Sequence, residues 1–275
     1  MLKKLLKYDW ILMWRIPAMI NLFLVVITLL GIIFLLSPAW QMDDSDSMFF
    51  FLTKMLLTFF YIIFLIAGSI TIMVYIAVRY YKNIYTDEGY LTNTLPADPW
   101  QIVLSKLLVS SVWILITGIL VVLSILSLVA ANLITMEYAT LEDLFIAIPE
   151  LFGLIADEID LPGPIIILIS IFSAILGSML NVLIIFSSIA LGQLFSKHRV
   201  AGAFLWYILQ YVIIQFANNL LLNLPVVYYS EHLSYHDSEI ITRALWSGQM
   251  LGSILLSGLL FFLTEILLRK NLNLE

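Results

Sequence analysis

Long apolar stretches, separated by shorter polar ones, dominate the chain. Six of them reach or exceed the roughly 20 residues that a helix needs to cross a bilayer. We expect membrane spans at 17–37, 48–78, 107–134, 164–195, 200–224 and 247–268. None of these stretches sustains the alternation of apolar and polar residues that strands of a membrane barrel require. The pattern therefore predicts an all-α integral membrane protein with six transmembrane helices, forming a single domain over residues 1–275.

Residues 1–16 predict a helix of another kind. At about 100° per residue, the apolar side chains of Leu2, Leu5, Leu6, Leu12 and Met13 share one arc. The basic residues gather on the opposite arc: Lys3, Lys4, Lys7 and Arg15. This pattern favours an amphipathic helix in the membrane interface, with a solvated basic segment ahead of the first span as the alternative. Asp9 falls within the apolar arc, where we expect it to pair with a basic group from elsewhere in the bundle.

Composition supports the membrane interpretation. Hydrophobic residues make up 62% of the chain, charged residues 12%, and the mean hydropathy is +1.04. That leaves too little polar surface to cover a water-soluble protein of 275 residues. The sequence has no cysteine, which excludes a disulfide framework and a thiol nucleophile. We expect membrane lipids around the chain and no nucleic-acid partner.

The basic residues predict the orientation. With both termini on one side, that side collects Lys3, Lys4, Lys7, Arg15, Arg79, Lys82, Lys106, Lys197, Arg199, Arg269 and Lys270. The other side keeps two basic residues, Lys54 and Arg243. Because cytoplasmic loops of membrane proteins are enriched in Lys and Arg, both termini should be cytoplasmic in a multi-pass protein of the cell membrane.

A polar stretch interrupts the apolar pattern at 85–101, "YTDEGYLTNTLPADPWQ". Asp98, Pro99 and Gln101 predict a helix start, with Asp98 as N-cap and Gln101 at the reciprocal position of a capping box. Gly89 and the following "LTNTLP" can turn the chain, which leaves residues 84–88 as a short helical segment outside the membrane. The stretch is either a structured loop that docks a soluble partner or a plain connection.

Two quoted segments carry a family resemblance. "RYYKNIYTDEGYLTNTLPADPWQIVLSK" and the later "LGQLFSKHRVAG" resemble the permease subunits of bacterial ATP-binding-cassette exporters of the type 2 class. In that family the loop after the second span holds a coupling helix that sits in a groove of the ATPase. The resemblance implies that ATPase coupling involves Tyr85, Thr86, Asp87, Glu88, Gly89, Tyr90, Lys197, His198 and Arg199.

The same resemblance implies the partners. No Gly-Lys dipeptide occurs, so the chain lacks the phosphate-binding loop of P-loop ATPases. We therefore expect a transport subunit without catalytic residues or a cofactor of its own. ATP and Mg would be bound by two copies of a separate ATPase subunit, and a second permease would complete a homodimer or a heterodimer.

For the cargo we expect amphipathic or antimicrobial-type peptides, with a lipid-linked molecule or a drug as the alternative. An intramembrane enzyme is the rival class, although the spans lack a catalytic constellation. Candidate substrate-path residues lie in the outer half of the second span: Phe51, Lys54, Met55 and Phe59. Lys54 should either face the bundle interior or extend toward the acidic residues Asp43, Asp44 and Asp46.

Two segments predicted to lie on the outer side each have two possible interpretations. Apolar and acidic residues alternate at helical spacing in the segment 135–163, which predicts an amphipathic helix broken near Pro149. It would be a simple cap on the bundle or an acidic vestibule that draws a cationic cargo outward. His232 and His236, four residues apart, either belong to a solvated loop or bind a metal ion such as zinc.

Overall fold

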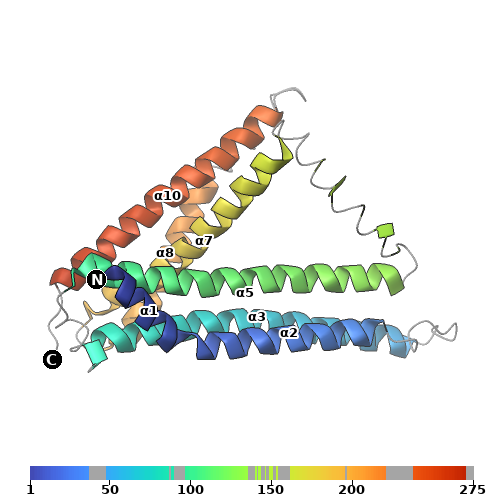
Figure 1. The fold of residues 1–275 in the computed structure, drawn as a ribbon, viewed down its shortest axis with the longest axis horizontal. Helices are drawn as coiled ribbons and strands as arrows, with labels where there is room; N and C mark the ends of the chain where they lie inside the picture. Colours follow the sequence, from blue (N-terminus) through green and yellow to red (C-terminus); the bar gives the residue numbers. More distant parts are fainter. Residues whose placement is uncertain are drawn as a thin grey trace. The chain divides into compact units, whose positions relative to one another are not determined.

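The computed structural model describes residues 1–36, 48–86, 88–89, 97–135, 140, 142–143, 146, 149–150, 153, 162–195, 197–220 and 238–270. Within these ranges all regular structure is helical, and no strand occurs. The helices are α1 (Leu2–Met13), α2 (Arg15–Leu35), α3 (Met48–Tyr85), α5 (Pro99–Thr135), α7 (Gly163–Gly192), α8 (Arg199–Asn218) and α10 (Ser238–Lys270) (Figure 1).

Six of these helices are long and apolar enough to cross a membrane. In their most apolar windows only 11% to 22% of residues are buried inside the chain. Something apolar must cover the remainder, since a water-exposed surface of this kind would be strongly unfavourable. The prediction of an all-α protein with six candidate membrane spans is therefore confirmed.

Several helices extend beyond the apolar stretches that predicted them. Helix α3 continues to Tyr85, beyond the span expected to end near 78. Helix α5 begins at Pro99, the helix start that the capping residues predicted, ahead of the span expected from 107. Helix α10 likewise begins at Ser238, ahead of the expected 247. Hydropathy locates the apolar part of a helix, but the backbone hydrogen-bond ladder continues into polar sequence until a turn ends it. A separate helical segment was expected at 84–88. Instead, Ile84 and Tyr85 are the last two residues of α3.

The described chain groups into two compact units. The first contains Met1–Trp10, Ile76–Val112 and Gly153–Glu275, and the second contains Ile11–Tyr75 and Trp113–Phe152. That the chain acts as one functional domain stays a prediction.

In the first unit, α7 packs against both α8 and α10 (Figure 1). Its residues from Val182 to Ala190 are all buried, on every face of the helix. A helix apolar around its whole circumference is typical of a central position. Hydroxyl groups in this stretch are satisfied locally: Ser187 donates to the Ile184 carbonyl oxygen at 3.1 Å and to Gln210 Oε1 of α8 at 2.8 Å.

In the second unit, α2, α3 and α5 run side by side (Figure 1). Leu24, Tyr61 and Leu65 form a buried cluster, against which Ile27 and Leu128 pack. Gly68 permits this packing, because a Cβ there would lie 2.6 Å from Leu24 Cδ2. Small residues at such positions let membrane helices approach closely.

The described residues of segment 135–163 include a helix start. The Thr140 amide donates to Asp143 Oδ2 at 2.8 Å, and the Asp143 amide donates to Thr140 Oγ1 at 3.3 Å. These reciprocal bonds form a capping box. The bond from the Thr140 amide, together with that from its hydroxyl, holds the pKa of the Asp143 carboxyl below its ordinary value. Pro149, where a break was expected, is helical, as is Glu150; residues 147–148 and 151–152 lie outside the described part.

The close approach of α7 and α8 gives a stability prediction. A Cβ on Gly192 would lie 2.6 Å from the Ala203 backbone nitrogen, whereas one on Gly177 of the same helix meets nothing within 4 Å. We expect Gly192→Ala to lower the Tm in detergent by roughly 5 °C, because overpacking costs about 1 to 3 kcal/mol. Gly177→Ala is the matched control and should be neutral or slightly stabilising, since Ala favours the helix. Equal Tm changes in the two variants would contradict the close approach.

Candidate functional site

The end of α3 carries the first predicted site residues. Thr86 Oγ1 donates to the Lys82 carbonyl oxygen at 2.6 Å, and the Gly89 amide donates to the Thr86 carbonyl oxygen at 2.7 Å. A Cβ on Gly89 would lie 2.2 Å from the Ile84 carbonyl oxygen. Only glycine fits so close to the preceding helix turn. The backbone therefore folds back on itself at this point, and Gly89 is a structural requirement of the turn.

An aromatic platform supports this turn. Tyr80 is buried, and its ring stacks on Phe186 of α7 with centroids 3.7 Å apart and planes 10° apart. Tyr85 meets Tyr80 edge-on, with centroids 6.3 Å apart. Ile84, between them in sequence, has no exposed surface. Stacked and edge-on aromatic pairs add to the energy of area burial. The end of α3 thus contacts α7, in the same unit, through the Tyr80–Phe186 stack.

Charge at the turn is partly balanced within the chain. Arg79 Nη1 lies 3.8 Å from Glu88 Oε2, with the two side chains 25% and 56% exposed. Pairs this exposed contribute about 0 to 1 kcal/mol. Lys82 is exposed nearby in the sequence. Glu88 therefore remains accessible to a soluble partner although it has a neighbour of opposite charge.

The start of α5 holds a much stronger charge pair. Pro99 opens the helix as predicted, and the Gln101 amide donates to the Asp98 carbonyl oxygen at 2.9 Å. One turn further on, Lys106 Nζ donates to Asp9 Oδ1 at 2.9 Å, and Ser105 Oγ donates to Asp9 Oδ2 at 2.7 Å. The Lys106 and Asp9 side chains are only 9% and 13% exposed. The expectation that Asp9 pairs with a basic group elsewhere is confirmed, and its partner is Lys106.

The second predicted cytoplasmic loop is short. Lys197 and His198 are exposed, and Arg199 begins α8 half-buried. The Gly202 amide donates to the His198 carbonyl oxygen at 2.8 Å, which closes the first turn of α8. The close contact of Gly192 with Ala203 holds the helices on both sides of this loop together. These residues belong to the same unit as the turn after α3.

Other predicted site residues are placed only in part. Asp87 and Tyr90 lie outside the described residues, as do His232, His236 and the acidic group at 43–46. The side chain of Phe51 is also outside them. Of the substrate-path residues, Lys54 is half-buried, whereas Met55 and Phe59 are exposed, all on the α3 part of the second unit. Among described residues, no group of three or more His, Asp or Glu side chains could hold a metal ion.

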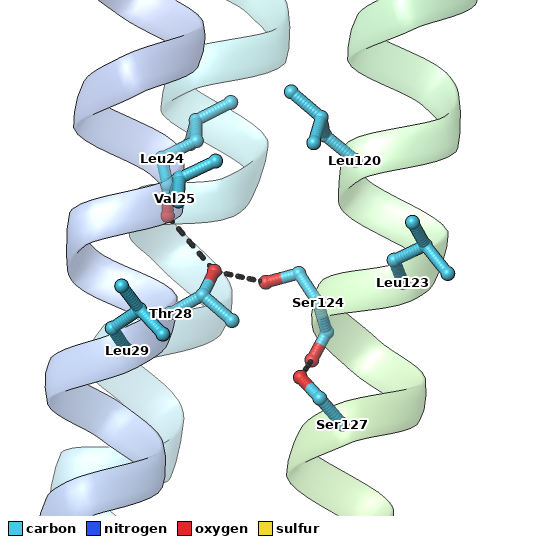
Figure 2. Close-up of a pocket in the computed structure, with 8 residues that line it drawn as sticks. All are labelled: Leu24, Val25, Thr28, Leu29, Leu120, Leu123, Ser124 and Ser127. Atoms are coloured by element: carbon cyan, nitrogen blue, oxygen red, sulfur yellow. Dashed lines mark hydrogen bonds between the residues drawn. The ribbon is translucent and has the colours of Figure 1, made fainter.

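The second unit has a polar feature that the sequence interpretation missed (Figure 2). Thr28 of α2 meets Ser124 of α5 with oxygens 2.5 Å apart, and Thr28 also donates to the Leu24 carbonyl oxygen at 2.8 Å. Tyr61 of α3 hydrogen bonds to Ser124 as well. Beside this cluster lies a pocket of about 210 Å³ lined by Leu24, Val25, Thr28, Leu29, Leu120, Leu123, Ser124 and Ser127. These hydroxyls bond to one another, so the cluster joins three helices; isolated polar residues within apolar spans were its only sequence signal.

The two ion pairs give a second prediction. Asp9→Asn should lower the Tm by about 10 °C, because removing one partner of a buried pair costs about 3 to 5 kcal/mol. The exposed pair is the matched control, and Arg79→Gln should change the Tm by no more than about 3 °C. The double variant Asp9→Leu with Lys106→Met should recover most of the loss, since no buried charge is left unpaired. A Tm unchanged by Asp9→Asn would refute the buried pair.

Comparison of the chain with models of known protein families, with curated proteins and with solved structures finds no match. The geometry of the site and the quoted sequence motifs are therefore what a functional proposal rests on. In that geometry, two helix ends rich in polar residues and one short basic loop belong to a single packed unit. Their exposed atoms are hydrogen-bonding groups and charges suited to binding another protein.

Proposed function

We propose that the chain is the membrane-spanning permease subunit of an ATP-driven exporter of the ATP-binding-cassette type 2 class. One observation carries the proposal: the motif "YTDEGYLTNTLP" begins at Tyr85, the last residue of the long apolar helix α3, and ends before the start of α5. In the family that the motif resembles, this is the position of the coupling helix. The chain itself lacks a phosphate-binding loop, so a separate subunit must hydrolyse ATP.

The packing beneath the motif supports a coupling role. A loop that transmits force to membrane helices has to be joined to them by rigid contacts, because packed elements move as units. The Tyr80–Phe186 stack provides such a contact to α7, and Ile84 next to the motif is fully buried. Helix α7 in turn packs against α8 and α10. Movement imposed at 85–90 would therefore reach three candidate spans of the same unit.

The partners follow from this role. Two ATPase subunits would bind ATP and Mg, and a second permease would pair with this chain as a homodimer or a heterodimer. The large apolar surface that the chain leaves uncovered is compatible with contact to both lipid and a second subunit. Both termini would lie in the cytoplasm, with the protein in the cell membrane.

For cargo, we favour amphipathic or antimicrobial-type peptides over a lipid-linked molecule or a drug. Met55 and Phe59 are 62% and 61% exposed on α3. Polarizable, adaptable side chains of this kind suit loose recognition of varied apolar surfaces. An export path along such a surface would leave the cargo partly in lipid.

The coupling proposal predicts the effect of a charge reversal at Glu88. Glu88→Lys should abolish co-purification of the ATPase and ATP-dependent transport while leaving the permease folded and inserted. The physical reason is that a docking contact made by a carboxylate becomes a repulsion. Co-purification with the partner ATPase, and the Tm of the permease alone, are the two measurements.

Arg79→Gln is the control for this experiment. It breaks the same intrachain pair, whose atoms are 3.8 Å apart, without changing Glu88. If Glu88 acts by contacting the ATPase, Arg79→Gln retains the complex. Loss of the complex in both variants would mean that the Arg79–Glu88 pair, and not a contact of Glu88 with the ATPase, is what the complex requires. Retention of the complex in both variants would show that this turn is not part of the coupling interface.

The cargo proposal is tested in vesicles that contain the permease and its ATPase. Amphipathic helical peptides should stimulate ATP hydrolysis, and Met55→Ala with Phe59→Ala should reduce this stimulation several-fold by removing adaptable contact surface. Ile66→Ala with Ile70→Ala, an equally exposed pair on the same helix, should have little effect. A flat response to peptides of several charges, with stimulation by a lipid or a drug, would replace the peptide proposal by its alternative.

A further inference from the structure

Helix α1 has a fixed rotational setting. Its one acid, Asp9, is held by Lys106 Nζ at 2.9 Å and by Ser105 Oγ at 2.7 Å. At about 100° per residue, Asp9 lies on the side opposite to Lys3, Lys4 and Lys7. Burial agrees with this setting, since Leu2, Leu5 and Leu6 are half-buried and Met13 is 6% exposed. Much of the apolar arc that sequence alone assigned to the lipid is therefore covered by the chain itself.

The outward side of α1 is cationic and aromatic. Lys3, Lys4 and Lys7 are all exposed; we call them the cationic face. Arg15, just beyond the helix end, is exposed too. With its only acid in the ion pair, α1 presents no exposed negative charge to offset them. Exposed rings lie on or beside the same helix: Tyr8 is 64% exposed, Trp10 41% and Trp14 45%.

The chain connectivity limits how far the C-terminal end of α1 can lie from the membrane. Helix α1 ends at Met13, and α2, a candidate membrane span, begins at Arg15. One residue of separation keeps the C-terminal end of α1 within about a turn of the membrane boundary. Tyr and Trp concentrate at that depth in membrane proteins, and Lys side chains reach from it to the phosphates.

We propose that the cationic face of α1 is a binding surface for the headgroups of anionic phospholipids. Its positive charge complements a negatively charged headgroup, whereas a zwitterionic lipid offers no net charge to attract it. The Asp9–Lys106 pair has a positioning role, because it turns the lysines outward and withdraws the one acid that would oppose binding. The proposal does not depend on the transport function.

Direct lipid selectivity tests this surface. The purified full chain is reconstituted in phosphatidylcholine vesicles with trace spin-labelled phosphatidylglycerol or phosphatidylcholine, and the motionally restricted fraction of each label is measured. Phosphatidylglycerol should be preferred, and the preference should fall in about 1 M NaCl, where the Debye length is about 3 Å. Equal restriction of the two labels would overturn the proposal.

Two triple variants with the same change of charge separate this surface from general attraction. Lys3→Gln, Lys4→Gln and Lys7→Gln together should weaken phosphatidylglycerol binding by about tenfold, because each lysine near an anionic surface contributes up to about fivefold. Lys82→Gln, Lys197→Gln and Lys270→Gln remove three exposed lysines elsewhere and should change binding by no more than about twofold. The corresponding three Lys→Arg changes in α1 keep the charge and should retain binding.

An equal loss in both glutamine variants would overturn the assignment to α1. Unchanged lipid selectivity in the α1 variant would also overturn the assignment. The cationic face would then bind something else, such as an acidic protein surface. The Tm of each variant in detergent distinguishes lost binding from lost folding. The three lysines are exposed, so their replacement should leave the Tm within about 2 °C of the parent.

Discussion

Helices in a bilayer gain little hydrophobic energy by packing against each other, because lipid chains are as apolar as the side chains they replace. How the helices of this protein are placed against one another therefore depends on polar contacts and on close approach of their backbones. The Asp9–Lys106 pair is the shorter and more buried of the two ion pairs found among the described residues. Hydrogen bonds among the hydroxyls of Thr28, Tyr61 and Ser124 join α2, α3 and α5. Gly192 lets α7 and α8 approach closely.

Helix extension beyond the apolar stretches has a functional consequence. Helices α3 and α5 carry regular backbone past the expected membrane boundary, to Tyr85 and from Pro99. The support is aromatic on the α3 side, through Tyr80 and Phe186, and ionic on the α5 side, through Lys106. A docking loop anchored at both ends loses less conformational entropy on binding than a free linker would.

Helix α1 illustrates how an ion pair can decide which face of a helix packs against the rest of the chain. The hydrophobic pattern alone would turn Leu2, Leu5 and Leu6 toward lipid, whereas the pairing of Asp9 places part of that arc against the chain. Desolvation makes an unpaired carboxylate costly, so the position of its partner outweighs the modest energy of a few leucines. The exposed mixture of lysine and aromatic side chains remains compatible with the interface.

The sequence by itself determined the class of protein, the number of apolar spans and the start of α5 at Pro99, because these depend on local composition and on capping residues next to one another. It also identified Asp9 as a residue in need of a partner. Only the tertiary structure decided that Lys106, 97 residues away, is that partner, that Tyr80 stacks on Phe186, and that Thr28 meets Ser124. The physical reason is that such contacts depend on how helices are rotated and placed in depth. Hydrophobic periodicity leaves both nearly free for the six candidate membrane spans, which are apolar on most sides.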